Sequence, residues 1–596
     1  MRGQADLFFV VGAVVAVVAA TIFAGLYGAR TRSTSDFLVA SRTVGPRWNA
    51  AAISGEFLSA ASFLGIAGLL VKDGVDALWY PVGFTAGYIA LLLFVAAPLR
   101  RSGAYSLPDF AEERLSSARL RKICTVFVII IGWLYLVPQL QGAGLTVATV
   151  LDYPQWVGAA VVMVIVTFNI YTGWMRSTTV VQAFQYWIKL TALAVPVFIL
   201  LIHHASGDRP LRNSPDTAVP SAFAKATDIR AERDVVLRIQ EPIPVRISTE
   251  GRLISETVTW PPGEHLISSG TTLHFEAGSR IPELSGAAVD HDSWLRPFSG
   301  SPGSGDHSLL ATYSLIMALM LGTMGLPHIL GRYYANPDGR AARKTTLVVL
   351  ALLSLFYLFP MISGWLAWLY VPPLLVTGDN DAALLLLPQA ALGGWGGQLL
   401  GSLIAAGAFA TFVSAASGLV VSVAGVLSSD VLPGRLRDFK AATLAAWSVP
   451  LAFALAVSSL DLAQGVGLAF AVAASSFCPL LMLGIWWRGL TDAGAAAGLL
   501  VGGGLAFAAV LPAASGLLKP GWQEVLAQPA VFTVPLAFLT MVVVSRRTRD
   551  RVPIDVTRIL LRLHAPDRLG LAEDPDIARL GMAATLLRPR SGRHRR

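Results

Sequence analysis

Residues 53–64, ISGEFLSAASFL, lie inside an apolar segment long enough to cross a membrane, and they decide how the rest of the chain is interpreted. The stretch places an acid, Glu56, next to Gly55 and among three serines. Hydrocarbon disfavours both a charge and a loosened backbone, so this segment must face protein or a water-filled cavity. Glycine and hydroxyl residues let a helix open and offer oxygens to a cation such as Na⁺. The alternative interpretation is a helix-packing face of small residues, with a buried partner for Glu56.

Composition identifies the class of protein. The chain has 596 residues, of which 54% are hydrophobic and only 14% are charged, whereas soluble domains carry about 25% charged residues. This is a polytopic membrane protein. Its net charge of +9 comes from Arg and Lys in short loops and at the C-terminus, which membrane topology explains better than nucleic-acid binding. The two cysteines, Cys124 and Cys478, support neither a disulfide framework nor a zinc site.

Windows of about 20 apolar residues predict an all-α integral membrane protein with about thirteen transmembrane helices. The expected spans are 7–28, 49–70, 77–99, 123–150, 155–174, 182–203, 308–332, 345–371, 398–427, 441–459, 463–486, 493–513 and 529–545. Loops rich in Arg and Lys alternate with loops that lack them, so the positive-inside rule puts the N-terminus outside and the C-terminus in the cytoplasm. The odd number of spans gives the same orientation. We therefore expect a multi-pass protein of the plasma membrane.

The long connection after the sixth span is the one soluble insert, and the parity of spans puts it outside. Short alternating stretches, such as Val235–Ile239 and Thr271–Phe275, favour a small β-rich lobe, and a partly disordered loop remains the alternative. The predicted organisation is a first transmembrane helix, a first repeat, an extracytoplasmic insert, a second repeat, two further spans and a basic cytoplasmic tail. These correspond to residues 1–30, 49–203, 204–307, 308–486, 487–545 and 546–596.

A second interruption matches the first. Residues 322–328, GTMGLPH, break the seventh span, five spans after the break in the second. Glycine or proline interruptions at corresponding places in two halves are the best sequence pointer to a transporter site. The spacing suits two inverted five-helix repeats, spans 2–6 and 7–11.

The ninth span carries a row of hydroxyls. Thr411, Ser414 and Ser417 recur at three-residue spacing and so share one helix face. They are candidates either for cation ligands shared with the broken second span or for hydroxyls bonded back to their own helix.

Four stretches together resemble the sodium:solute symporter family, and within it the acetate and short-chain monocarboxylate permeases. They are GEFLSAASFLG (55–65), YTGWMRSTTVVQ (171–182), MALMLGTMGLPHILGR (317–332) and GLAFAVAAS (467–475). The resemblance covers roughly residues 36–203 and 308–500. It implies a five-plus-five inverted-repeat core, as in leucine-transporter-like (APC) proteins, that works by alternating access.

The resemblance also implies a cation site between the second and ninth spans. Its positions are the carbonyls of Gly55 and Leu58, with Thr411, Ser414 and Ala415 on the partner helix. Sodium-coupled members commonly have two adjacent hydroxyls there, but this chain has Ser414 followed by Ala415. Because hard cations need several oxygen ligands, the lost hydroxyl weakens the case for Na⁺ and strengthens that for H⁺.

Two titratable residues are candidates for carrying a proton, Glu56 and His328. A carboxylate substrate would be held by half-helix N-terminal amides at the breaks and by side-chain donors. The candidates for these donors are Ser59, Ser62, Gln139, Thr323 and His328. Lys189, in the sixth span, is expected to pair structurally or to extend its amine to the membrane surface rather than to bind the substrate.

These patterns predict a Na⁺- or H⁺-coupled symporter that imports acetate or another short-chain monocarboxylate. It needs no cofactor and no metal beyond the coupling ion, and its partners are the substrate, that ion and membrane lipid, with no nucleic acid and no obligate protein partner. The alternatives are the same fold serving another small solute (proline, a sugar, pantothenate) and a transporter-like sensor. A membrane enzyme is disfavoured because no acid, base or metal-ligand cluster is visible at membrane depth.

Overall fold

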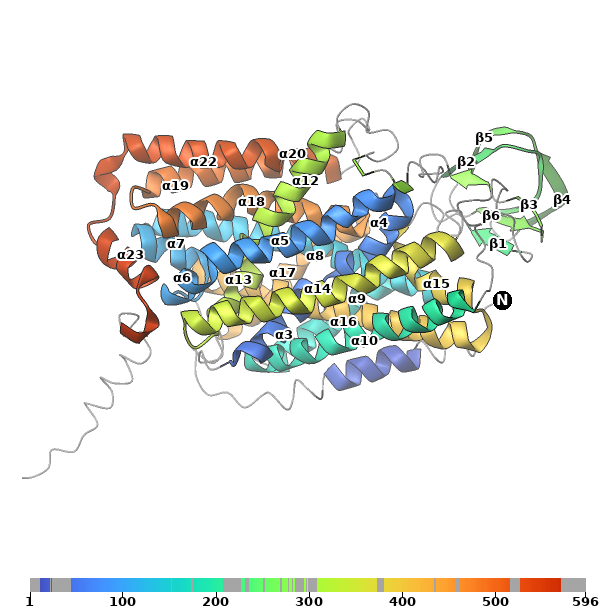
Figure 1. Cartoon of the computed structure of the whole chain (residues 1–596), viewed down its shortest axis with the longest axis horizontal. Helices are drawn as coiled ribbons and strands as arrows, with labels where there is room; N and C mark the ends of the chain where they lie inside the picture. The colour runs from blue at the N-terminus through green and yellow to red at the C-terminus, as the bar shows by residue number, and fades with distance from the viewer. Residues whose placement is uncertain are drawn as a thin grey trace, which may run out of the picture.

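The structure is a computed structural model of the whole chain (Figure 1). It describes residues 11–21, 23, 44–151, 153–172, 175–206, 227–230, 235–249, 252–267, 271–276, 278–280, 282–284, 294–295, 297–298, 308–371, 380–432, 436–456, 461–514 and 526–569. In this part of the chain, ten apolar helical runs are long enough to cross a membrane, and two shorter apolar helices, Val11–Thr21 and Gln155–Tyr171, accompany them. Each of the thirteen expected spans contains helix.

The first five-helix unit begins with an interrupted helix. α3 (Pro46–Phe57) stops at Leu58, and after a π-helical turn (Ala61–Gly65) the helix resumes as α4 (Ile66–Asp73). Gly74, with φ of 63°, reverses the chain into the next span. The unit continues with α5 (Trp79–Phe94), α6 (Ala96–Arg101), α7 (Leu107–Leu115), α8 (Ala118–Leu151), α9 (Gln155–Thr172) and α10 (Met175–Ala205).

The second five-helix unit repeats this plan. α12 (Ser308–Thr323) stops before Met324, and α13 (Pro327–Tyr333) restarts at a proline, which is favoured at a first helical turn. It is followed by α14 (Gly339–Tyr370), α15 (Ala383–Ala391), α16 (Gly394–Val426), α17 (Leu436–Ala456) and α18 (Leu462–Trp486). The chain ends in α19 (Asp492–Gly498), α20 (Gly504–Ala514), α22 (Ala530–Arg547) and α23 (Val556–His564).

The packing of the helices shows the internal symmetry. In the first unit α3 contacts α10 and α14, and in the second the corresponding α12 contacts α18 and α5. The pair α8 and α9 corresponds to α16 and α17, and the contact between α10 and α16 corresponds to that between α18 and α8. The two units therefore pack against each other, and the two breaks, at Leu58 and Leu326, are buried in a bundle with a large apolar core.

The described part of the insert forms a lobe of β-strands. The strands are β1 (Thr227–Arg230), β2 (Val235–Ile239), β3 (Ile243–Thr249), β4 (Arg252–Trp260), β5 (Gly263–Ile267), β6 (Thr271–Phe275) and β7 (Glu283–Leu284). They form two antiparallel sheets, β1-β6-β3-β4 and β5-β2-β7. Inward-facing residues such as Leu237, Val245 and Phe275 give the lobe its own small core.

The lobe and the tail lie at opposite ends of the bundle (Figure 1). After the lobe, the indole of Trp294 donates to the carbonyl of Leu70 at 2.8 Å and packs on Trp368. At the other end, part of the tail packs on the bundle. Arg101 binds Asp567 at 2.9 Å, and the tail helix α23 packs against α6. Residues 1–10 and 570–596 lie outside the described part.

Candidate functional site

The break in the first unit is held open by side chains of its neighbours. Leu58 has extended backbone angles between α3 and the π-helical turn, which leaves helix-end amides and carbonyls without helical partners. The side chain of Gln139 on α8 accepts a hydrogen bond from the amide of Ala60 at 2.9 Å. Ser62, in the turn, shares a hydrogen bond of 3.0 Å with Tyr357 on α14. Two of the predicted substrate residues, Gln139 and Ser62, therefore support this break.

Lys189 occupies the position expected for the coupling cation. Its ammonium donates to the carbonyl of Leu58 at 2.8 Å, to the hydroxyl of Ser414 at 2.8 Å and to the carbonyl of Gly55. The Ser414 hydroxyl also donates to Gly55. Lys189 is fully buried. Its amine therefore does not extend to the membrane surface, which was one of the two expectations for this residue. The structure thus brings Gly55, Leu58 and Ser414 together around an amine.

The other two predicted cation positions contribute no side-chain oxygen to this cluster. Thr411 donates back to the carbonyl of Gly407 at 2.8 Å, one turn earlier on α16. Ala415 is buried and carries no polar side-chain atom. Ser417, the third member of the hydroxyl row, donates to the carbonyl of Val413. The row on the ninth span is therefore mainly bonded to its own helix, with Ser414 as the exception.

Glu56, which lies between Gly55 and Leu58 in the sequence, forms a buried ion pair whose cationic partner the sequence did not identify. Its carboxylate accepts from Arg332 on α13 at 2.6 Å, and both side chains are at most 2% exposed. Arg332 also donates to Thr179 at 2.9 Å and to Gln182 on α10. In the sequence, Arg332 is the last residue of the predicted span 308–332. In the structure the short helix α13 turns it inward. A buried carboxylate such as Glu56 needs a cationic partner at the same depth in the membrane. This requirement could have identified Arg332 from the sequence.

The break in the second unit has a different environment. Thr323, a predicted substrate residue, donates to the carbonyl of Leu319 on its own helix, so its hydroxyl is occupied. His328, at the start of α13, packs edge-on against Tyr135 with ring centroids 5.2 Å apart. Tyr135 in turn contacts Phe470, and Phe470 contacts Phe57. A cluster of buried aromatic rings therefore lies between the two breaks; we define it as Phe57, Phe84, Tyr88, Tyr135, Tyr357 and Phe470.

Several buried polar atoms of this central region make no hydrogen bond within the described part of the chain. They include Nε2 of His328 and the hydroxyl of Tyr88, and both residues are buried. A buried polar group without a partner costs about 1–3 kcal/mol, so such groups point to a polar ligand. Ser59, the remaining predicted substrate residue, is also buried beside the first break.

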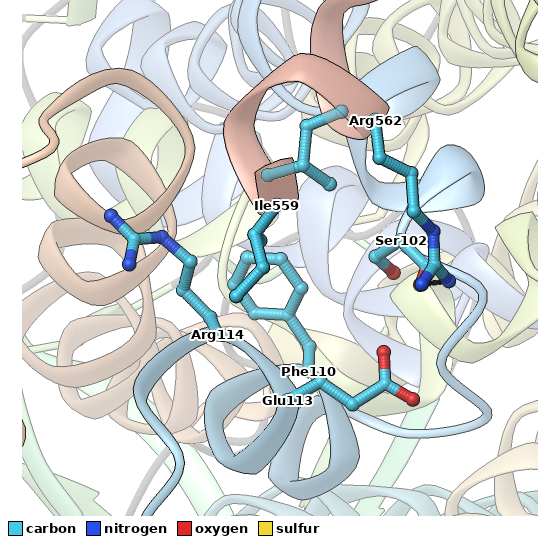
Figure 2. A pocket seen from close by; sticks show the side chains of 7 residues that line it. Ser102, Phe110, Glu113, Arg114, Ile559 and Arg562 are labelled. Atoms are coloured by element: carbon cyan, nitrogen blue, oxygen red, sulfur yellow. Dashed lines mark hydrogen bonds between the residues drawn. The ribbon is translucent and has the colours of Figure 1, made fainter. Parts of the chain in front are cut away.

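A surface pocket lies elsewhere, where the tail docks. It has a volume of about 190 Å³ and is lined by residues of α7 and α23 together with Ser102. In Figure 2, Ile559 of α23 lies over Phe110 of α7, and Arg562 reaches across to the backbone at Ser102. None of the predicted site residues lines this pocket. It belongs to the contact between the tail and the bundle, and the candidate site stays at the two breaks.

No group of three or more His, Cys, Asp or Glu residues is placed to hold a metal ion anywhere in the described ranges. The polar groups of the site are an ion pair, an amine, hydroxyls, amides and one imidazole. These groups bind ions and polar solutes, which is the chemistry of a transport site.

Comparisons with known proteins identify the family and the fold. The sodium:solute symporter family matches residues 37–244 and 302–502. The chain is 28% identical to the uncharacterized symporter YwcA of Bacillus subtilis, over 88% of this chain and 91% of that protein. It is 27% identical to a monocarboxylic acid transporter of Corynebacterium glutamicum, over 86% of each chain.

Among solved structures, a Na⁺-coupled sialic acid symporter in a substrate-bound, outward-open state has the same fold. The TM-score is 0.59 at 14% sequence identity, and the alignment covers 91% of this chain and 98% of that one. The two broken helices, their inverted packing and the family match agree with one another. The protein is a multi-pass solute transporter rather than an enzyme, and it belongs to the sodium:solute symporter family.

Proposed function

We propose that this protein imports acetate or another short-chain monocarboxylate together with a cation, Na⁺ or H⁺, across the plasma membrane. The observation that carries the proposal is the central region between the two breaks. There, the partnerless polar atoms of His328 and Tyr88 face an environment of aromatic rings. A ligand with one polar group and a very short apolar part satisfies both features.

A carboxylate is the polar group that this region suits best. After each break the chain becomes helical again, in the π-helical turn Ala61–Gly65 and in α13, and helix N-termini favour negative charge. Gln139 already caps the amide of Ala60, and a substrate oxygen takes up donors of the same kind in other transporters with broken helices. The relative in Corynebacterium glutamicum, named a monocarboxylic acid transporter, supports the same substrate class.

The charged residues at the two ends of the bundle support one orientation of the chain in the membrane. The end that carries the lobe has Asp76, Asp381 and Asp461 with Lys72. The end that carries the tail has Arg100, Arg101, Arg121 and Arg562. Because cytoplasmic loops carry the excess of Arg and Lys, we place the tail in the cytoplasm and the lobe outside.

Counterflow in proteoliposomes tests the substrate class. Vesicles loaded with unlabelled pyruvate should take up labelled pyruvate, and external acetate and propionate should compete while proline, glucose and pantothenate should not. Protein-free vesicles measure the leak of the neutral acid. If proline, glucose or pantothenate competes and the short carboxylates do not, that solute is the substrate of this transporter. Absence of counterflow for every solute would favour a sensor.

A further inference from the structure

The amine of Lys189 matches its three acceptors one for one. An ammonium has three N–H donors and no acceptor. The acceptors around it are the carbonyls of Gly55 and Leu58 and the hydroxyl of Ser414, which come from α3 and α16. These are the oxygens that the family resemblance assigned to the coupling cation. A sodium ion on the same oxygens would displace the ammonium, so one positive charge at a time fits this position.

The charge of Lys189 has no carboxylate of its own. The nearest acid is Glu56 on α3, which is already paired with Arg332 of α13. From the amine's own helix, Tyr186 donates to the carbonyl of Leu352. The packed helices α15 and α16 contain no titratable residue, and α3 adds only Arg47 at its first turn. The titratable and charged residues of α14 are Arg340, Arg343, Lys344, Tyr357 and Tyr370. The ammonium is thus held mainly by neutral oxygens.

Resting on the symport proposed above, we propose that the coupling ion is a proton and that the Lys189 amine carries it. Protonated Lys189 takes the place of Na⁺ and ties α3 and α10 to α16. Loss of one proton from Nζ to the inner solution leaves a neutral amine with two N–H donors, and a proton from the outer solution restores the ammonium. One proton then enters with each carboxylate, so the cycle is electroneutral.

The same geometry explains why deprotonation changes the structure. Hydrogen bonds from an ionised donor are roughly twice as strong as those between neutral groups. When the proton leaves Lys189, one of its three hydrogen bonds to the break at Leu58 is lost. The remaining hydrogen bonds become weaker because the amine is no longer charged. The tie between α3 and α16 weakens at the break, where the backbone is already outside a regular helix. Ala415 is consistent with this assignment, because it removes an oxygen that Na⁺ would need and an ammonium does not.

Proteoliposomes with labelled pyruvate test the proposal at clamped membrane potential. An inward gradient of one pH unit should drive about tenfold accumulation in one-to-one symport, since one unit corresponds to a factor of ten. A tenfold Na⁺ gradient of about the same driving force should give no accumulation. Pyruvate is preferred to acetate because the stronger acid leaks less as the neutral form, and protein-free vesicles are subtracted.

Two substitutions separate a proton carrier from a structural tie. Lys189→Met removes the amine, and Lys189→Arg keeps a positive charge and several donors but does not deprotonate in proteins. Both variants should lose accumulation driven by the pH gradient, from about tenfold to about onefold, and their thermal unfolding in detergent shows whether they are folded. The matched control is Lys72→Met. This lysine is partly exposed and pairs with Asp461 at 2.7 Å near the lobe, so proton-driven accumulation should be unchanged.

Several outcomes would overturn the proposal. If Lys189→Arg accumulates pyruvate on a pH gradient, the amine is a structural tie and not the carrier. If the wild-type protein accumulates pyruvate only on a Na⁺ gradient, proton coupling is wrong while monocarboxylate symport stands, and this result needs no variant. If the wild-type protein shows no counterflow with any short carboxylate, the proposed function itself fails.

Discussion

The two broken helices of this transporter have the same backbone design and different chemistry. At each break a glycine lies against a backbone carbonyl of the helix packed beside it, Gly55 against Gln182 of α10 and Gly325 against Ala473 of α18. Each break contains an extended leucine, Leu58 and Leu326. The two repeats therefore have the same backbone arrangement at their breaks.

The side chains around the two shapes are not equivalent. The first break holds an ion pair, an amine and hydroxyl groups, whereas the second is bordered by aromatic rings and a single imidazole. The described fixed charges meet beside the first break, where Arg332 of α13 reaches Glu56 and Lys189 bonds Leu58. We infer that the symmetry of the fold supplies the two half-helix ends. The different side chains then give the first break a role in ion coupling and the second break a role in substrate contact.

The largest expected effect comes from the buried pair at the first break. Glu56→Gln leaves Arg332 buried without its carboxylate, and breaking such a pair costs about 3–5 kcal/mol. Thermal unfolding in detergent should show this loss as a markedly lower transition temperature. The double variant Glu56→Gln with Arg332→Met should recover much of the stability, because no charge is then left unpaired. A double variant as unstable as Glu56→Gln alone would contradict this account.

The shared shape predicts a matched effect at both breaks. An alanine Cβ at Gly55 or at Gly325 would lie within 3.0 Å of a neighbouring carbonyl, so the packed helices must separate. Gly55→Ala and Gly325→Ala should each cost about 1–3 kcal/mol. Gly331→Ala on α13 is the control, since nothing lies within 4 Å of its added Cβ. If only one of the two breaks were sensitive, the breaks would not be equivalent in packing.

Because the two breaks carry different side chains, substitutions at each break should have different kinetic effects. His328→Ala removes a candidate substrate contact at the second break and should raise the KM for pyruvate about tenfold, the value of one hydrogen bond of about 1.4 kcal/mol. The coupling ratio should stay the same. Lys189→Arg should instead change the coupling ratio. A change of coupling ratio in His328→Ala would place the imidazole in ion coupling instead.

The smallest expected effect is far from both breaks, at the tail. Burial raises the pKa of Asp567, but its hydrogen bonds and charge interaction with Arg101 outweigh this, and the pKa lies below its ordinary value. The pair therefore stabilises tail docking above the pKa of the unfolded chain, and this contribution is lost as the pH falls below about 4. Asp567→Asn should speed hydrogen exchange in α23 by a small factor, because a partly exposed pair contributes about 0–1 kcal/mol. Unchanged exchange would mean that apolar contacts alone hold the helix.

The sequence predicted the helices and the positions of the breaks because both have local causes. Runs of about 20 apolar residues mark a span, and GTMGLPH and ISGEFLSAASFL interrupt their runs visibly. It did not predict which polar groups meet. Lys189 reaches Leu58 across 131 residues of chain, and Arg332 reaches Glu56 across 276. Such contacts depend on how α3, α10, α13 and α16 pack, and residue periodicity along one helix contains no information about that.

The ion pair between the two repeats also bears on how the protein is made. Glu56 emerges from the ribosome and enters the membrane long before Arg332 has been synthesised. Until then the first repeat contains an acid and the amine of Lys189 without the helix that completes the cluster, and each charge at a span centre costs about 2.5–3.5 kcal/mol during insertion. The first repeat is therefore an incomplete membrane unit. Its broken helix reaches its final position only when the second repeat arrives, so biogenesis of this transporter is cooperative across both halves.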